Sequence, residues 1–528
     1  MEFDAVILGA GASGTFAALG LEGCKVLVLD YGNYIEKPVP EYDNLYNTKK
    51  KDTDFYDSII GENFESLDNL FKDEVTPKVK APLMNFVVKD AENYLNKKDS
   101  NFSPTTSLAK GGLANVWGAQ VYRFDQNDLK SFPCTEAELS QYYDDVSEEI
   151  GISGSATDDL APLHGKEPLL QPELQSSKMG ELILKGYVKN KNRFNKKGIF
   201  IGKPRLAVLS KEHLGRKPLN YGNLEFFLPG NSAFYSPVFT LDRLIANQKI
   251  HYKNGYLALR FEENKEGVTV FAKNMRTGLE EIFNAKKLLI GLGCIHTAKF
   301  VLDSKKDFNT RLPLLENPMS FTPLVNPVRI GKAQEKSTYS SDLTLFYNGE
   351  KSEDTVVAML YNLDGLLRSD TTFDFPFSAK SNLTAAKYVM PSMMAMQVYY
   401  SQKAAVSNYM KLNEDGSLKF NYKHHHNKEV EKLLIGALSS IGFLSHISLS
   451  KFSEAGKSIH YAGQLPMKIK PEKNYETDAN GKLFGHQHTH IIDSATFPFL
   501  PAKNLTFTIM ANALKISRYI QNQLLTNI

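Results

Sequence analysis

The stretch FDAVILGAGASGTFAALGLEGCKVLVLD, residues 3–30, decides the fold of this chain. Residues 5–8 are a short apolar run of the kind that a buried parallel strand shows, and residues 15–21 continue as a short apolar helix. Residues 25–30 predict a second buried strand. Strand, glycine turn, helix and strand together make a βαβ unit of minimum length, so the chain opens with an α/β domain.

The turn of this unit is a GxGxxG pattern formed by Gly9, Gly11 and Gly14. The first glycine allows the tight turn, the second lets a phosphate approach the backbone, and the third lets helix and strand pack closely. N–H groups at the start of the helix, around Ala12 and Ser13, would face a pyrophosphate. Glycine turns are common, so the hexapeptide taken alone is a weak signal.

Asp30 makes the glycine turn a stronger signal for dinucleotide binding. It ends the second strand 21 residues after Gly9, where a carboxylate accepts hydrogen bonds from both ribose hydroxyls of a dinucleotide. A structural turn followed by a helix-capping aspartate is the alternative. The strand, the turn and the acid together predict dinucleotide binding, and they do not distinguish FAD from NAD.

Composition narrows the class of protein. The 528 residues are 42% hydrophobic and 23% charged, as in an ordinary globular enzyme, and a net charge of +3 gives no field that argues for nucleic acid. Cys24, Cys134 and Cys294 are odd in number and far apart, which favours a reducing compartment over a disulfide framework. No stretch reaches the ~20 apolar residues of a membrane span, and no signal peptide precedes the first strand, so we expect a cytoplasmic protein.

Alternating patterns follow the opening unit. They predict strands at residues 256–261, 267–272, 286–290, 340–347, 355–361 and 393–400, of which the last three suggest an antiparallel sheet in a separate domain. Helical patterns cover residues 135–150, 295–302, 429–443 and 505–523. Asn504 is the expected N-cap of the last of these helices.

Each of four further clusters, taken alone, could serve only the structure of the protein. They are the glycine loop 111–118 with Trp117, the only tryptophan in the chain; the segment 460–467 that begins with His460; the segment 491–498; and residues 504–506. A lone histidine is more often a core residue than a catalyst, and a glycine loop is more often an ordinary turn.

Two histidine groups resemble metal sites. His424, His425 and His426 are consecutive and point different ways, so they do not share one ion easily. His486, His488 and His490 alternate, and in a strand they would lie on one face, but no cysteine or carboxylate completes a zinc site. We therefore predict no metal, with a zinc site as the alternative for the second group.

The order of the four clusters behind a dinucleotide fingerprint resembles the glucose-methanol-choline (GMC) family of flavin oxidoreductases over nearly the whole chain. The resemblance implies FAD as cofactor, His460 as active-site base and Asn504 as its partner. It also implies a cofactor site made of Gly9, Gly11, Ala12, Ser13, Gly14, Asp30, Gly111, Gly112, Asn115, Trp117, Gly118, Gly291, Asp493, Ser494 and Thr506.

The same resemblance implies a discontinuous Rossmann-like FAD-binding domain and a substrate domain built on an antiparallel β-sheet. The expected segments are 1–130, the first part of the FAD-binding domain; 131–225, a helical and loop insertion; 226–310, the second part of the FAD-binding domain; 311–454, the substrate domain; and 455–528, the C-terminal part of the FAD-binding domain with His460 and Asn504.

The chain departs from the family pattern in two places. Trp117 precedes Gly118, as in the pyranose-oxidase-like and sugar-dehydrogenase branch, but Val116 stands where some of that branch carry a flavin-linked histidine. We therefore expect FAD to be bound non-covalently. Gln464-Leu465-Pro466 stands where the family often has Gly-Thr, which bears on the shape of the substrate pocket.

The expected function is an FAD-dependent oxidoreductase acting on CH–OH groups, with a sugar or sugar-containing alcohol as substrate and an electron acceptor that the sequence does not name. Neutral His460 would take the hydroxyl proton, and its unperturbed pKa of ~6.5 would place its titration near neutrality. The alternatives are a nicotinamide-dependent dehydrogenase and a non-catalytic flavin- or carbohydrate-binding protein. The first leaves 111–118 and the C-terminal segment unexplained, and the second does not need His460.

Overall fold

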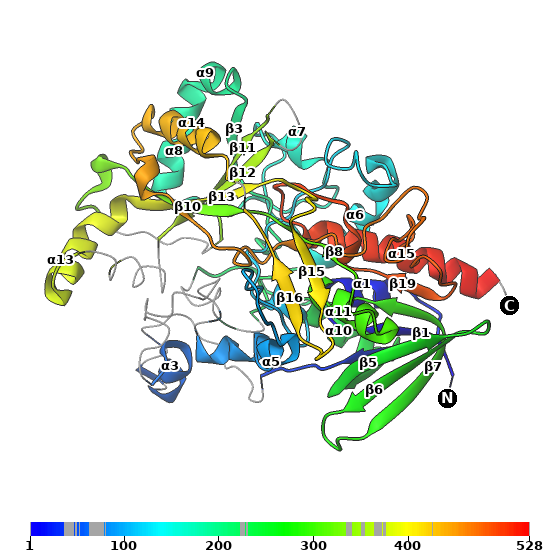
Figure 1. Ribbon diagram of the computed structural model, residues 1–528. Helices are drawn as coiled ribbons and strands as arrows, with labels where there is room; N and C mark the ends of the chain where they lie inside the picture. Colours follow the sequence, from blue (N-terminus) through cyan, green and yellow to red (C-terminus); the bar gives the residue numbers. More distant parts are fainter. Residues whose placement is uncertain are drawn as a thin grey trace.

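The fold is described from a computed structural model. It describes residues 2–35, 47, 50–51, 53–62, 79, 81–221, 228, 231–333, 340–349, 354–363, 372, 376–424 and 426–526. Figure 1 shows a nucleotide-binding part at the lower right and a second sheet, covered by helices, at the upper left.

The opening βαβ unit forms as its sequence predicts. β1 (Phe3–Leu8) and β2 (Val26–Asp30) are parallel and paired through Ile7 and Val28, and α1 (Ala12–Gly20) connects them. All five residues of β2 and the last four of β1 are buried, which explains their continuous apolar composition. The unit is the centre of a larger sheet.

That sheet has seven strands in the order β4-β2-β1-β7-β6-β5, and β19 also pairs with β7. β4 (His251–Asn254), β7 (Glu280–Ile290) and β19 (Thr489–Ile491) extend the parallel part of the sheet. β5 (Tyr256–Glu263) and β6 (Val268–Asn274) pair antiparallel with each other, and β6 pairs antiparallel with β7. Because these strands come from distant segments, the nucleotide-binding sheet is discontinuous in sequence, as predicted.

Helices cover both faces of the parallel strands. On one face α1 packs against α15 (Thr506–Thr526), which in turn packs against α6 (Glu136–Ile150). α10 (Pro237–Ala246) also contacts α1 on this side. α11 (Cys294–Lys305) packs on the other face, against β5. A capping box between Thr135 and Glu138 starts α6 at the residue that the sequence predicts.

A second, antiparallel sheet confirms the predicted α+β part of the fold. Its order is β17-β10-β13-β12-β11-β3. The strands are β17 (Lys451–Phe452), β10 (Met319–Val325), β13 (Met393–Tyr400), β12 (Val356–Asn362), β11 (Leu343–Tyr347) and β3 (Ile199–Gly202). β3 lies within residues 131–225, so that segment contributes an edge strand to this sheet.

The two faces of the antiparallel sheet have different tasks. One face, with Leu324, Met396 and Val398, forms a core with three helices, which are α8 (Lys178–Lys189), α9 (Lys191–Asn195) and α14 (Lys428–Ser439). The other face, with Met319 and Tyr399, turns toward the nucleotide-binding part. Alternation along β10 and β13 therefore separates a helix-covered core from the wall of a cavity.

The remaining elements are short or lie at the edges. They are α3 (Thr53–Ile60), α5 (Ala91–Leu95), α7 (Ala161–His164), α13 (Ala379–Val389), β8 (Leu312–Pro313), β9 (Leu315–Glu316), β14 (Gln402–Lys403), β15 (Tyr409–Leu412), β16 (Leu418–Asn421), β18 (Tyr461–Ala462) and β20 (Phe499–Leu500). β9 and β18 matter most for function, because they pair with each other and bring Glu316 beside Tyr461.

Candidate active site

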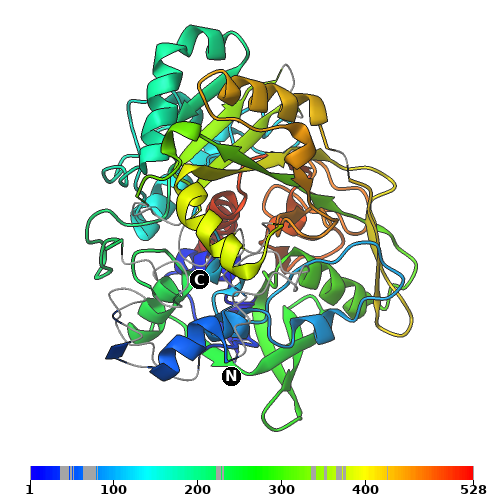
Figure 2. The same ribbon diagram turned by 90° about the vertical axis from the view of Figure 1, so that its left-hand side faces the viewer.

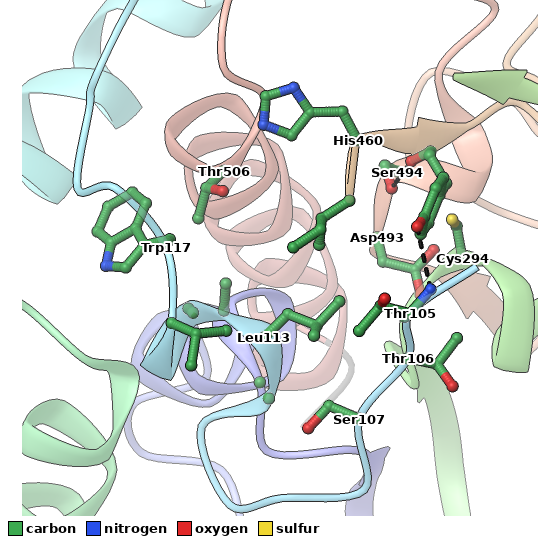
Figure 3. Close-up of a pocket in the computed structure, with 18 of the residues that line it drawn as sticks. Thr105, Thr106, Ser107, Leu113, Trp117, Cys294, His460, Asp493, Ser494 and Thr506 are labelled. Atoms are coloured by element: carbon green, nitrogen blue, oxygen red, sulfur yellow. Dashed lines mark hydrogen bonds between the residues drawn. The ribbon is translucent and has the colours of Figure 1, made fainter. Parts of the chain in front are cut away.

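One cavity of about 590 Å³ extends from the ends of β1 and β2 to the antiparallel sheet. Asp30 lines it at the nucleotide-binding end, and His460 and Asn504 line it beside Met319 and Tyr399. Figure 3 shows His460 at the top of the cavity, Trp117 on one side and Asp493 on the other. The candidate cofactor residues and the candidate catalytic pair therefore border one continuous space.

The three glycines of the fingerprint have different surroundings. Gly9 has a φ of +91°, which favours glycine, and a Cβ on Gly14 would lie 1.8 Å from the carbonyl oxygen of Gly9. A Cβ on Gly11 would meet only the Cα of Gly112, at 3.9 Å. Gly14 thus serves the packing of the turn and does not line the cavity. At Gly11 the backbone is open toward the cavity, and no side chain caps the first turn of α1.

Asp30 is buried at the far end of the cavity. Its Oδ1 accepts a hydrogen bond from the N–H of Ala10 at 3.3 Å, and its Oδ2 accepts one from the hydroxyl of Tyr252 at 3.1 Å. Burial raises the pKa of Asp30 to about 7. Each carboxylate oxygen keeps a further lone pair, so the geometry leaves room for two ribose hydroxyls.

The glycine loop lies beside the start of α1, where Gly112 approaches Gly11. Trp117 lines the cavity and its indole N–H donates to the carbonyl oxygen of Tyr235 at 2.7 Å. Asn115 does not line the cavity, because its amide N–H groups donate to the carbonyls of Lys110 and Gly112 at 2.9 and 2.8 Å. Gly111, with a φ of +85°, also lies off the cavity and shapes the loop.

The remaining cofactor candidates lie on the wall of the same cavity. The Ser13 hydroxyl donates to the carbonyl of Gly291 at 3.4 Å. Asp493 is buried, accepts from the Thr297 hydroxyl at 2.5 Å, and has a pKa that burial raises to about 6. Ser494 follows Asp493 on the cavity wall, and Ala12, Gly112, Gly118 and Thr506 line it as well.

An amide fixes the tautomer of His460. Its Nδ1 lies 3.2 Å from Oδ1 of Asn317, and both N–H groups of that amide are used, since Nδ2 donates to the carbonyls of Tyr400 and Pro501 at 2.9 and 2.8 Å. An amide oxygen in the Nδ2 position would face two acceptors, so Oδ1 must be the atom that faces His460. Nδ1 therefore carries the proton and Nε2 keeps its lone pair.

The pKa of His460 differs from the value near neutrality that the sequence suggests. Its ring stacks on Tyr399 with centroids 4.7 Å apart and planes 22° apart. Burial lowers the pKa of His460 to about 3, so the expected pKa near neutrality is wrong. The physical reason is that a cationic imidazolium loses its hydration in this enclosed wall of the cavity. The ring is neutral throughout the physiological range.

A buried carboxylate holds the loop that presents His460. The Glu316 side chain accepts hydrogen bonds from the N–H groups of Gly456 and Ser458 and from the Ser458 hydroxyl, at 2.9 to 3.0 Å. Ile459, between this clamp and His460, has a φ of +62°, which a β-branched residue rarely adopts. The surrounding contacts must therefore impose this backbone conformation, which aims the ring into the cavity.

Asn504 partners His460 and does not cap α15. Its Nδ2 lies 3.4 Å from Nε2 of His460, and within the described part of the chain its buried Oδ1 has no hydrogen-bond partner. The expectation that Asn504 is the N-cap is wrong, because α15 begins at Thr506 and its first backbone hydrogen bond runs from the N–H of Ile509 to the carbonyl of Leu505, at 2.9 Å. The amide faces the cavity, and this position outweighs its preference for a helix start.

The end of the cavity beside His460 is mostly apolar and aromatic. The described side chains there are those of Trp117, Met319, Phe321, Tyr361, Leu363, Ala395, Gln397 and Tyr399. Gln397 is the amide of this set, and its Nε2 donates to the Tyr399 hydroxyl at 3.0 Å. Neutral walls of this kind accept an uncharged substrate more readily than an ion.

Neither histidine group forms a metal site in the described residues, where no three His, Cys, Asp or Glu side chains are placed so that they could hold a metal ion. His424 contacts Glu316 at 2.8 Å, and His425 lies outside the described residues. His486 contacts Glu263, and the carbonyl of Asn480 is the partner of His490. Across the same described residues, no helix has the length and apolar character needed to cross a membrane.

Comparison with known proteins gives the class of the enzyme. Residues 425–513 match the family model described as GMC oxidoreductase. The fold matches the crystal structure of pyridoxine 4-oxidase from Mesorbium loti with a TM-score of 0.60, at 11% identity, over 98% of this chain and 99% of that chain. No curated protein matches the sequence. The likeness at 11% identity concerns the fold alone.

The fold, the cavity and the family model define an FAD-dependent oxidoreductase that acts on alcohols. The match over residues 425–513 agrees with the family resemblance inferred from the sequence motifs, and it includes both His460 and Asn504.

Several residues of the site carry no signal in the sequence. Tyr252 reaches Asp30 from β4, Asn317 reaches His460 from the residue after β9, and Tyr399 reaches it from β13. Thr105, Thr106 and Ser107 line the cavity just before the glycine loop, and their polar run was the available hint. The other positions depend on strand register, which no local motif records.

Proposed function

We propose that this enzyme removes a hydride from a CH–OH group of its substrate, with His460 as the general base and Asn504 as the group that orients the alcohol. The observation that carries the proposal is the tautomer of His460. Asn317 occupies Nδ1, so the lone pair of Nε2 faces the cavity beside Nδ2 of Asn504. A base needs this arrangement to receive a hydroxyl proton.

The residues of the cavity suit FAD. The open backbone at Gly11 and the uncapped start of α1 would accept the pyrophosphate, Asp30 would accept the ribose hydroxyls, and the start of α15 would offer partial positive charge to the flavin. Bound FAD supplies the hydride acceptor, and the protein supplies position and field. Asp30, Gly11 and Thr506 all border the one cavity that also contains His460.

In the reaction, the alcohol loses a hydride from carbon and a proton from oxygen, and a carbonyl forms. Nε2 of His460 would take the proton, and the Nδ1–H bond to Asn317 would hold the resulting imidazolium in place. Asn504 would donate its Nδ2–H to the alcohol oxygen or accept the hydroxyl through its unpartnered Oδ1. Because burial disfavours the imidazolium, the proton would leave His460 before the next turnover.

We further propose a sugar or sugar-containing alcohol as substrate. Trp117 and Tyr361 present aromatic surfaces to the cavity, and the apolar face of a sugar ring packs against such surfaces. The amide of Gln397 offers a polar partner for a ring hydroxyl. The neutral walls agree with a substrate that carries no charge.

The test is anaerobic bleaching of the flavin. The purified protein should absorb visible light as an oxidised flavin, and a sugar alcohol or aldose should bleach it in the absence of oxygen. Bleaching by NADH with no response to any alcohol would instead assign the chain to nicotinamide chemistry. Bleaching by sterols or small alcohols with none by sugars would overturn the sugar proposal and keep the reaction class.

We propose that the FAD is bound non-covalently, because Val116 is buried where a linking histidine would have to stand and offers no nucleophile. Acid precipitation should therefore release all of the yellow colour into the supernatant. Colour that stays with the precipitated protein after washing would contradict non-covalent binding. Mass spectrometry of the pellet would then locate the attachment.

The low pKa of His460 predicts how the rate of flavin reduction depends on pH. A base that titrates at about 3 is neutral and ready to accept a proton at every pH well above that value. We expect the rate constant for flavin reduction to stay level from about pH 8 down to about pH 5, and to fall only toward the pKa. Stopped-flow reduction at saturating substrate measures it. A limb centred near pH 6.5 would show that substrate or FAD restores the usual pKa of the ring.

We propose the cytoplasm as the location of the enzyme. Cys24, Cys134 and Cys294 are all buried as free thiols, a state that a reducing compartment maintains. Alkylation of the denatured protein taken directly from cells should modify all three.

A further inference from the structure

Exposed hydrophobic side chains gather on one surface of the substrate domain. Eight of the nineteen large hydrophobic side chains that are exposed in the described part of the chain lie in three segments, 321–333, 376–390 and 441–452. They are Phe321, Val328, Ile330, Phe377, Leu383, Tyr388, Leu444 and Leu449. We call the surface formed by these three segments the α13 face. Such a concentration of apolar groups indicates an interaction surface.

The three segments form one continuous surface. The N–H of Gly331 donates to the carbonyl of Tyr388 at 2.8 Å, which joins the first segment to α13. The N–H of Val325 donates to the carbonyl of Leu444 at 2.9 Å, which joins the first segment to the third. In Figure 1 α13 projects from the edge of the molecule, and Figure 2 shows it in front, near the middle of the view.

α13 exposes large hydrophobic side chains to solvent, whereas an ordinary surface helix buries them. Its exposed stripe has helical spacing and consists of Lys380, Leu383, Thr384, Lys387 and Tyr388. Leu383 is 64% exposed and Tyr388 is 50% exposed, whereas the buried side contains Ala386 and the polar Asn382. A helix that presents leucine and tyrosine outward between lysines has the composition of an interfacial helix.

The charge of the α13 face has one sign. None of the three segments contains an aspartate or a glutamate. Lys332, Lys380, Lys387 and Lys451 are exposed on them. A surface that is both apolar and cationic complements a bilayer with anionic headgroups, because its lysines meet the phosphates while its apolar side chains enter the boundary with the acyl chains.

The same sheet face connects the α13 face to the cavity. Met319 and Phe321 line the cavity from β10, and Val325, further along the same side of that strand, packs with Ala386 of α13. Ala395 of β13 belongs to both sets, since it lines the cavity and packs in this cluster. The strands that line the active site, β10 and β13, therefore also contact the buried side of α13.

We propose that the α13 face docks on the surface of an anionic lipid bilayer. Leu383, Tyr388, Val328 and Ile330 enter the interface, and Lys380 and Lys387 lie among the headgroups. The protein remains on one side of the membrane, with the substrate end of its cavity directed toward the lipid. This binding is independent of the reaction proposed above, so either can fail without the other.

Vesicle co-sedimentation of the full chain tests the proposal. The protein should sediment with vesicles of phosphatidylcholine mixed with phosphatidylglycerol, and much less with vesicles of phosphatidylcholine alone. Salt near 1 M, at which the Debye length shrinks to about 3 Å, should release most of it. The double variant Lys380→Gln, Lys387→Gln should bind about 30-fold more weakly, at about fivefold for each lysine, and Leu383→Gln about tenfold more weakly.

Matched controls lie on the hairpin of β6 and β7. Lys273→Gln changes an exposed lysine there, and Leu279→Gln changes a leucine that is 67% exposed, so both should bind as the parent does. Equal losses in the controls, or no sedimentation of the parent with anionic vesicles, would overturn the proposal. So would equal binding to both kinds of vesicle. A concentration-dependent dimer that Leu383→Gln abolishes, without vesicle binding, would assign the face to a second copy of the chain.

Discussion

Replacing His460 by alanine should slow flavin reduction by about 10²–10⁴-fold, the usual contribution of a general base, while the flavin remains bound. The reason is that Nε2 faces the cavity with its lone pair, 3.4 Å from Nδ2 of Asn504, and Asn317 fixes the proton on Nδ1. Asn504→Ala should slow reduction less, because its amide orients the alcohol and takes no proton. Single-turnover reduction under anaerobic conditions measures both variants.

The His460 test needs readouts that a purely structural role would not move. Added imidazole should restore part of the rate in His460→Ala, since the lost ring leaves space beside Tyr399, and it should leave the parent unchanged. His486→Ala is a matched control, because that ring pairs with Glu263 outside the cavity. Reduction of His460→Ala at the parent rate would return His460 to the role of a core residue.

Replacing Asp30 by alanine should raise the dissociation constant for FAD by about 10²–10⁴-fold. Two ribose hydrogen bonds to a charged acceptor contribute about 1.5–3 kcal/mol each, and every 1.4 kcal/mol is about tenfold. Equilibrium titration of the apoprotein measures the constant. Tyr252→Phe serves as control, since it removes one neighbour of Asp30 and keeps the carboxylate. An unchanged FAD affinity in Asp30→Ala would exclude the ribose role.

The pH dependence of FAD binding offers an independent check on Asp30. Burial raises its pKa to about 7, and the ribose hydroxyls need the ionised carboxylate. The affinity of the parent should therefore weaken as the pH falls below 7, because protons compete for the same oxygens, and the affinity of Asp30→Ala should lack this slope. A parent affinity that is flat between about pH 8 and about pH 5 would count against the assignment.

Local spacing explains what the sequence predicts well. The sequence predicts β1, α1 and β2 correctly, because the turn, the buried runs and Asp30 occupy one short stretch. The geometry of that stretch is set by residues that are neighbours in sequence. The pairing of His460 with Asn504 needed the family resemblance, because 44 residues separate them. Asn317 and Tyr399 were not predictable, since they reach the ring only through the pairing of β9 with β18 and the register of β13.

The two wrong expectations have one cause. The unperturbed pKa of a histidine and the capping preference of an asparagine both describe side chains in water or at an exposed helix end. In the folded chain His460 is buried against Tyr399 and Asn504 turns to the cavity, where its carbonyl oxygen has no partner in the described residues. The demands of a shared site outweighed both intrinsic preferences.

The packing of α1 against α15 also governs how the chain reaches its native state. Residues 21–505 separate the two helices, so α1 is synthesised long before its principal neighbour. Until α15 has been made, the side of α1 that packs on it is uncovered, and β1 lacks β7 at its edge until residue 290 has been made. Contacts of such long sequence separation slow folding and prolong the exposure of sticky intermediates. We therefore expect refolding of the denatured chain to be slow, with α1 and β1 among the last elements to gain their native contacts.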